Sequence, residues 1–157
     1  VSPPRVELGH RLHTTAGAQM VELNVLRSPG KEEFTRIAFY RGRGYVDWDR
    51  SEGWARHREE RDSVIVIDTS YSSSLGDVES RAPEIAPVYV APGETLKLRI
   101  FVDRSVVEVF ANDRQCATVR VYPGREDSVG VSLRAQGGEA ILRSLDAWQM
   151  RSIYAAD

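Results

Sequence analysis

Residues 96–110 decide the fold, and they read Leu96–Lys97–Leu98–Arg99–Ile100–Phe101–Val102–Asp103–Arg104–Ser105–Val106–Val107–Glu108–Val109–Phe110. Over 96–102 the aliphatic residues occupy every second position, and a similar alternation covers 105–110. A period of two points successive side chains to opposite sides of the backbone, so each run predicts a half-buried β-strand. Asp103–Arg104 lies between the runs and can close a tight turn. The stretch therefore predicts an antiparallel hairpin.

The same alternation recurs along the chain. Over Met20–Leu26 it places Val21, Leu23 and Val25 on one face and polar residues on the other. Further strands are expected at residues 36–40, 64–67, 88–90, 117–122, 129–134 and 140–150. Short strands in series predict an all-β fold, a two-sheet antiparallel β-sandwich of the concanavalin or jelly-roll-like kind.

Turn signals separate the strands of the second half. Asn112–Asp113 and Pro123–Gly124 mark two turns, and Gly137–Gly138 predicts a further hairpin. Together they predict an antiparallel meander from residue 96 onward. The charged stretch from Asp47 to Ser63 is expected to be a loop or a short helix, and residues 69–92 a surface connection containing the 88–90 strand.

The chain of 157 residues fits one domain. We expect a single sandwich over 1–157, with 1–15 a linker or leading strand, 16–150 the core and 151–157 a tail. The sequence begins at Val1 rather than Met, so we expect a fragment or a trimmed chain, and both a secreted and a cytoplasmic location fit.

Composition excludes several classes of protein. The formal net charge is −2, which argues against a nucleic-acid partner because such binders show a basic excess. No apolar run approaches the roughly 18 residues of a membrane helix. Cys116 is the only cysteine, so neither an intrachain disulfide nor a cysteine-based zinc site can form. Within its strand-like segment we expect Cys116 to be a small buried residue.

The sequence contains no motif that indicates a metal site or a cofactor site. His10 and His13 could share a metal only on a helix, and the local sequence is not strongly helical. No glycine-rich phosphate loop follows a strand, and no nucleophile-elbow motif is present. We therefore expect no metal site and no cofactor.

Asp103 and Glu108 are the one carboxylate pair that suggests a glycosidase, which needs two such groups. We favour structural roles for both. Asp103 can accept hydrogen bonds from turn amides, and Glu108 can pair with Arg99 or Arg120 on neighbouring strands. An unrelated enzyme that uses the pair as its acids stays an alternative.

Aromatic residues gather in the segment that contains Tyr45, Trp48 and Trp54. Aromatic rings can stack on the apolar C–H faces of sugars, so these three are the candidate carbohydrate-binding residues. The interpretation we favour is that these aromatic residues pack their loop onto the sandwich. Trp148 lies in a strand-like segment and is expected in the core.

Residues 98–110 resemble the strand pair that marks the C-terminal domain of glycoside hydrolase family 32, the family of invertases, inulinases, levanases and related β-fructosidases. The resemblance covers most of the chain, from about Met20 to Met150, and is strongest from Leu96 to Pro123. One departure is Arg114, which stands where the family often has a glycine after Asn–Asp. The residues that carry the signature are Asp103, Arg104, Ser105, Glu108 and Phe110.

The resemblance implies a β-sandwich packed behind a five-bladed propeller that holds the active site and cleaves sucrose or fructan glycosidic bonds. The family's catalytic residues lie in Trp–Met–Asn–Asp–Pro–Asn, Arg–Asp–Pro and Glu–Cys motifs. None of these occurs here, since Asn112–Asp113 is followed by Arg, Arg61–Asp62 by Ser, and Cys116 is preceded by Gln. No catalytic role can be transferred to a residue of this chain.

The leading functional hypothesis is therefore a non-catalytic accessory domain of a β-fructosidase. It would support a catalytic propeller in the same or a separate chain by packing or by oligomerisation, and a homo-oligomer is compatible with this role. The alternative is a carbohydrate-binding module for fructans or other polysaccharides, which would use Tyr45, Trp48 and Trp54.

Overall fold

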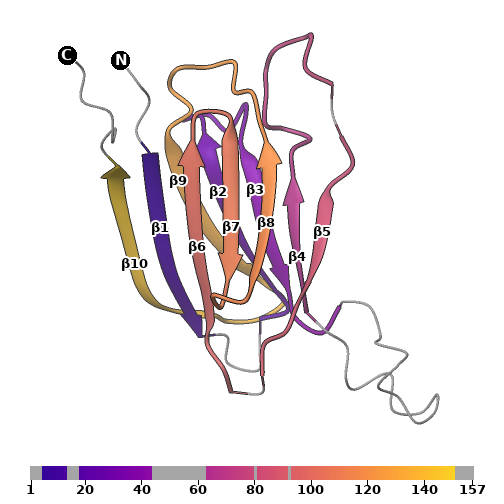
Figure 1. The fold of residues 1–157 in the computed structure, drawn as a ribbon, viewed down its shortest axis with the longest axis vertical. Coiled ribbons are helices and arrows are strands. Elements are labelled where there is room, and N and C mark those ends of the chain that lie inside the picture. Colours follow the sequence, from indigo (N-terminus) through magenta and orange to yellow (C-terminus); the bar gives the residue numbers. More distant parts are fainter. Residues whose placement is uncertain (1–4, 14–17, 44–62, 80, 92, 151–157) are drawn as a thin grey trace.

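A computed structural model of the chain describes residues 5–13, 18–43, 63–79, 81–91 and 93–150. Ten strands in these ranges form two antiparallel sheets of five strands each. Figure 1 shows the two sheets packed face to face, with sheet A in front of sheet B. The predicted all-β sandwich is confirmed.

Sheet B has the order β5-β4-β3-β2-β9. Four of its strands follow one another as a meander, and β9 adds to the free edge of β2. The strands are β2 (Met20–Arg27), β3 (Thr35–Tyr40), β4 (Ser63–Asp68), β5 (Glu84–Val88) and β9 (Gly130–Gln136).

Sheet A has the order β10-β1-β6-β7-β8. Its β1 lies between β10 and β6 and pairs with both. The strands are β1 (Arg5–His13), β6 (Leu96–Asp103), β7 (Val106–Ala111), β8 (Gln115–Arg120) and β10 (Ile141–Met150).

The predicted meander of the second half holds only for β6, β7 and β8. After β8 the chain crosses to sheet B, and after β9 it crosses back to sheet A. The hairpin expected at Gly137–Gly138 is therefore wrong, although both glycines have a positive φ. A local reversal does not determine which sheet receives the next strand, because that choice depends on burial between distant segments.

Alternation along the strands builds the core as predicted. Leu96, Leu98, Ile100 and Val102 of β6 are buried, while the residues between them are more exposed. They pack in one cluster with inward residues of both sheets, among them Val21, Leu23, Val25, Ile37, Phe39, Ile65, Ile67, Val107 and Val109.

Two residues expected in the core lie outside it. Cys116 is exposed, because Ala117 and Val119 take the inward positions of β8 and leave Cys116 on the outer face. Trp148 is half exposed on edge strand β10. It shares a register partner, Glu7, with Phe101, so both rings lie on the outer face of sheet A.

The described ranges contain neither a membrane-spanning helix nor a group of metal-binding side chains. No helix there is long and apolar enough to cross a membrane. Nor does that part of the chain bring three or more His, Cys, Asp or Glu side chains into a group that could hold a metal ion.

Candidate functional site

The turn between β6 and β7 contains Arg104 and Ser105. Asp103 ends β6 opposite Val106, and Arg104 has a φ of 54°. The carbonyl of Ser105 accepts a hydrogen bond from the amide of Val121 at 2.8 Å, just beyond β8. This hydrogen bond connects the β6–β7 turn to the segment that follows β8.

Glu108 and Phe110 lie on the outer face of sheet A, since Val107, Val109 and Ala111 between and beyond them face the core. Glu108 pairs in register with Phe101, whose ring meets that of Phe110 edge-on at 5.7 Å. The structure thus places all five signature residues in the hairpin or its turn, on or beside this outer face. Asp103 of β6 is exposed and pairs with Val106 of β7. Val106 lies two residues before Glu108 on β7.

The Asn112–Asp113 turn shows why a glycine is not needed at Arg114. Asn112 and Asp113 themselves have φ values of 48° and 55°, the pattern of a type I′ turn, and Asn and Asp tolerate that region best among non-glycine residues. The amide of Arg114 donates to the carbonyl of Ala111 at 3.0 Å and closes the turn. The Asn112 side chain accepts from the amide of Lys97 at 2.7 Å.

Tyr45, Trp48 and Trp54, the candidate carbohydrate-binding residues, fall outside the described ranges. The candidate site is therefore built from other residues, of two kinds. One is a buried carboxylate that joins the loops at one end of the sandwich, and the other is an apolar surface at one side of it.

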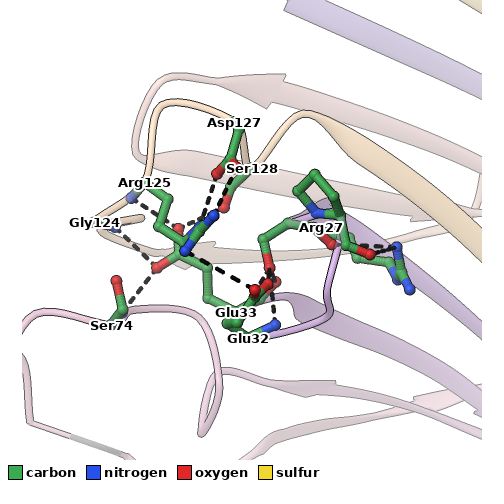
Figure 2. Close-up of polar contacts among 10 residues, drawn as sticks. Arg27, Glu32, Glu33, Ser74, Gly124, Arg125, Asp127 and Ser128 are labelled. Atoms are coloured by element: carbon green, nitrogen blue, oxygen red, sulfur yellow. Dashed lines mark hydrogen bonds and ion pairs between the residues drawn. The ribbon is translucent and has the colours of Figure 1, made fainter.

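Glu33, in the loop between β2 and β3, is the buried carboxylate. Figure 2 shows it surrounded by donors from two distant loops. Its Oε2 accepts from the amides of Ser74 at 2.8 Å and Gly124 at 3.0 Å. Its Oε1 accepts from the amide of Arg125 at 2.9 Å and the hydroxyl of Ser128 at 2.5 Å.

Each carboxylate oxygen of Glu33 thus has two donors, so the group is fully engaged and is not free to act as an acid or base. Burial raises its pKa, but the hydrogen bonds from Ser128, Gly124, Arg125 and Ser74 outweigh burial and hold the pKa of Glu33 below its ordinary value. An ionised Glu33 therefore fixes the β2–β3, β4–β5 and β8–β9 loops to one another.

A second layer of contacts surrounds Glu33 (Figure 2). The guanidinium of Arg125 pairs with Asp127 at 2.6 Å and approaches Glu32 at 4.0 Å. The hydroxyl of Ser28 donates to Glu32 at 2.5 Å and accepts from the amide of Glu32 at 2.8 Å. Of these contacts, the Arg125–Glu32 pair joins two different loops, and the others lie within one loop. Exposed ion pairs of this kind add little stability.

Apolar side chains are exposed on these cross-linked loops. Tyr71 stacks on Phe34 with ring centroids 5.4 Å apart, and its own ring is largely exposed. Leu75 in the β4–β5 loop is also exposed, as are Tyr122 and Val129 in the β8–β9 loop. The loops joined by Glu33 therefore expose several apolar side chains.

The side of the sandwich that contains β9 and β10 is open. Leu145 of β10 and Leu98 of β6 pair with the same residue of β1, His10, so both leucines lie on the inner face of sheet A. Leu142 and Leu96 share Leu12 in the same way. Figure 1 shows β10 and β1 with no strand of sheet B behind them.

Exposure separates the two sides of the molecule. At the β5 and β8 side, the inward residues Val88 and Val119 are 1% and 8% exposed. At the open side, the inward residues Val131, Leu142 and Leu145 are 40%, 41% and 49% exposed. Apolar residues on the inner face of a sandwich are normally covered, so we define Val131, Leu142 and Leu145 as the open-side surface.

Sequence reasoning did not single out Glu33 or the open-side surface. Glu33 stands in an ordinary charged turn, Lys31–Glu32–Glu33, and its partners lie 41 to 95 residues further along the chain. The only local hint is the neighbouring Ser28, which caps the turn by accepting from the amides of Glu32 and Glu33. No local pattern distinguishes Glu33 from Glu32.

Curated relatives of the chain include a levanase and several beta-fructofuranosidases. The sequence is 31% identical over 126 residues to the levanase of Bacillus subtilis, covering 80% of this chain and 16% of that protein. It is 34% identical over 137 residues to an acid beta-fructofuranosidase of Vigna radiata, covering 84% of this chain and 19% of the other. The chain thus spans less than a fifth of the length of these relatives.

Solved structures share the fold at low sequence identity. Fructan 1-exohydrolase IIa of Cichorium intybus superposes with a TM-score of 0.72 at 16% identity, covering 96% of this chain and 32% of that one. Sheep galectin-11 superposes with a TM-score of 0.55 at 16% identity and is covered over 93% of its length. The second likeness shows that the sandwich also exists as a small protein of about this size.

The sequence model described as "Glycosyl hydrolases family 32 C terminal" matches residues 4–149, which is nearly the whole chain. That span includes all ten strands apart from the last residue of β10. It also includes the hairpin signature at 98–110 on which the resemblance rested. The chain therefore belongs to the C-terminal domains of glycosyl hydrolase family 32.

Proposed function

We propose that the chain is a non-catalytic accessory domain that packs, through its open-side surface, against the catalytic domain of a sucrose- or fructan-cleaving enzyme. The exposure of Val131, Leu142 and Leu145 is the observation that carries the proposal. These apolar groups face inward and would leave water if another domain covered this side.

Two further observations support this role. The three catalytic motifs expected of the family are missing from the sequence. Among the described residues, the buried carboxylates Glu22 and Glu33 are bound to donors. The matched relatives are more than five times longer than the matched region, which leaves ample chain for a separate catalytic domain.

The non-catalytic half of the proposal is tested by assaying the 157-residue chain on sucrose, inulin and levan. We expect no hydrolysis above a blank. Hydrolysis that disappears when Glu108 or Asp103 is replaced by its amide would overturn this half and favour the carboxylate pair as catalytic.

The packing half is tested on the polypeptide that contains both this domain and the catalytic domain. The double variant Val131→Ser/Leu145→Ser should lower the temperature at which activity is lost, because it weakens the covered surface. The matched control is Ile85→Ser/Tyr89→Ser, which replaces two residues of similar exposure at the opposite side. Equal effects of the two variants would exclude the open-side surface as the interface.

A further inference from the structure

Strand β10 is an edge of sheet A with features that favour pairing. It is ten residues long and, within the described ranges, it pairs only with β1. The edge strands at the closed side are shorter, since β5 spans five residues and β8 spans six. β5 also contains Pro87, which cannot donate to a neighbouring strand. Short length, proline and lysine protect free edges in native proteins, and β10 contains neither proline nor lysine.

Both faces of β10 expose apolar side chains. Leu142, Leu145 and Ala147 share partners on β1 with the core residues of β6, so they lie on the inner face. Ile141 and Trp148 lie on the outer face. The four large residues among these five are between 41% and 49% exposed. A domain that covers the inner face leaves the outer groups in water, whereas an added strand gives every residue a neighbour on its own face.

The pairing of β10 with β1 has one irregularity, at Arg143. Arg11 pairs with Ser144 and Leu12 pairs with Leu142, so Arg143 is passed over. An extra residue of this kind is typical of a β-bulge. The bulge exchanges the faces of odd and even positions, which is why Leu142 points inward like Leu145. Any strand that pairs along the whole free edge must match this exchange.

A second copy of β10 matches it. Opposed side chains of an antiparallel pair lie on the same face, so each pair must join two inward or two outward residues. An antiparallel copy related by a two-fold axis at Leu145 meets this condition, with each Arg143 passed over as it is in the pairing with β1. The resulting pairs between the two copies are Leu145–Leu145, Ser144–Asp146, Leu142–Ala147 and Ile141–Trp148.

The two charged residues of β10, Arg143 and Asp146, are exposed and opposite in sign. Arg143 of one copy is next to Ser144, which lies opposite Asp146 of the other copy. The two-fold axis repeats this arrangement, so the register creates two attractive contacts and places no like charges opposite each other. This charge complementarity favours a second copy as the strand that pairs with the edge.

We propose that β10 pairs with β10 of a second copy of the chain, so that the two five-stranded A sheets join into one continuous sheet. The apolar pairs Leu142–Ala147 and Leu145–Leu145 lie on its inner face, and Ile141–Trp148 lies on its outer face. The pairing uses the edge of β10. The inner face of the joined sheet stays available to the catalytic domain of the proposed function.

Charge reversal tests the pairing. Sedimentation equilibrium of the 157-residue chain gives the dissociation constant of the dimer. Asp146→Arg should raise this constant about tenfold, because both symmetric contacts become repulsive. Arg143→Asp/Asp146→Arg exchanges the two charges and should restore the constant to within about twofold of the unaltered chain. The matched control is Glu84→Arg on edge strand β5, which changes the net charge equally and should leave the constant unchanged.

Cross-linking tests the register. In a Cys116→Ser background, Leu145→Cys should form a disulfide-linked dimer with oxidised glutathione, because opposed Cα atoms on the two-fold axis lie about 5 Å apart. Ala147→Cys is the matched control on the same inner face. It lies opposite Leu142 of the other copy and should stay monomeric. Non-reducing gel electrophoresis separates the two outcomes, and thermal unfolding confirms that each variant retains the fold.

Three results would overturn the proposal. They are a chain that stays monomeric at every concentration, a charge exchange that does not restore the dimer, and equal cross-linking of the two cysteine variants. A monomeric chain would assign the edge of β10 to a strand of the catalytic domain instead. Arg143 and Asp146 lie outside the open-side surface, so their failure leaves the packing role intact. That role is measured separately on the two-domain polypeptide.

Discussion

Glu33 illustrates how one side chain can organise a loop region. A carboxylate that leaves water loses solvation, and the loss is tolerated only when donors replace the water. Here four donors replace the water. Three come from the β8–β9 loop, namely the amides of Gly124 and Arg125 and the hydroxyl of Ser128. The fourth is the amide of Ser74. The polar interior of the loop end is therefore built around a charge and not around apolar packing.

Replacing Glu33 with Gln should lower the free energy of unfolding by about 3 kcal/mol, because an amide NH₂ would face donors that then lose their acceptor. Urea unfolding followed by tryptophan fluorescence measures the change. The matched variant is Glu32→Gln, whose neighbouring carboxylate is half exposed, and its effect should be much smaller. Equal losses in the two variants would show that Glu33 is not the organising group.

The same group predicts a dependence on pH. The pKa of Glu33 in the folded chain lies below its ordinary value of 4.5, so the folded state favours the ionised form. Its contribution to stability is complete above pH 4.5 and is lost as pH falls through the lowered pKa. The difference in unfolding free energy between the unaltered chain and Glu33→Gln should therefore shrink in acid, and a constant difference would contradict this account.

At the scale of elements, the pairing of β2 with β9 contains an irregularity. The register shifts between Asn24 and Arg27, and Leu26 within the shift has a φ of 48°. An extra residue in one strand bends it locally and is typical of a β-bulge. The bend brings the carbonyl of Arg27 against Gly130 on β9.

Gly130→Ala should therefore destabilise the chain by about 1–3 kcal/mol, because an added Cβ would lie 2.7 Å from the carbonyl oxygen of Arg27, and backbone cannot move aside as a side chain can. Gly76→Ala is the matched substitution, since its Cβ meets no atom within 4 Å. Thermal unfolding of both variants checks the prediction. A similar midpoint for the two would show that the bulge relaxes freely.

At the scale of the whole molecule, the sandwich is closed at the β5–β8 side and open at the β9–β10 side. Strand β10 is an edge strand, paired in the described chain only with β1, and its apolar residues are exposed on both faces. Ile141 and Trp148 lie outward, and Leu142 and Leu145 inward. Long exposed edges of this kind are normally covered in native proteins.

The isolated chain should therefore self-associate as its concentration rises, and Leu142→Ser/Leu145→Ser should reduce the association because both residues are half exposed at the open side. Sedimentation equilibrium measures the change. Ile85→Ser/Tyr89→Ser at the other side of the sandwich is the matched control and should leave the association unchanged. A chain that stays monomeric over the whole range would contradict the prediction.

Much of the fold follows from the sequence, because strand alternation and turn chemistry are local. The 96–110 hairpin, strands β2, β3 and β4 of sheet B and the inward positions of β6 follow from local apolar patterns and from turn residues. Strand β5 was expected at residues 88–90, but it spans Glu84–Val88. The family resemblance rested on the same hairpin. These features need no knowledge of distant segments, since each is determined by the backbone geometry of a few consecutive residues.

Tertiary structure alone decided the rest. Alternation shows that a strand has two faces but not which face is covered, so Cys116 and Trp148 were placed wrongly. Glu33 differs from Glu32 only through donors that arrive from loops up to 95 residues away. The open-side surface and the contact between Glu22 and Arg134 exist because sheet assembly brings β9 beside β2 and β10 beside β1. Long-range burial, not local pattern, selects those pairings.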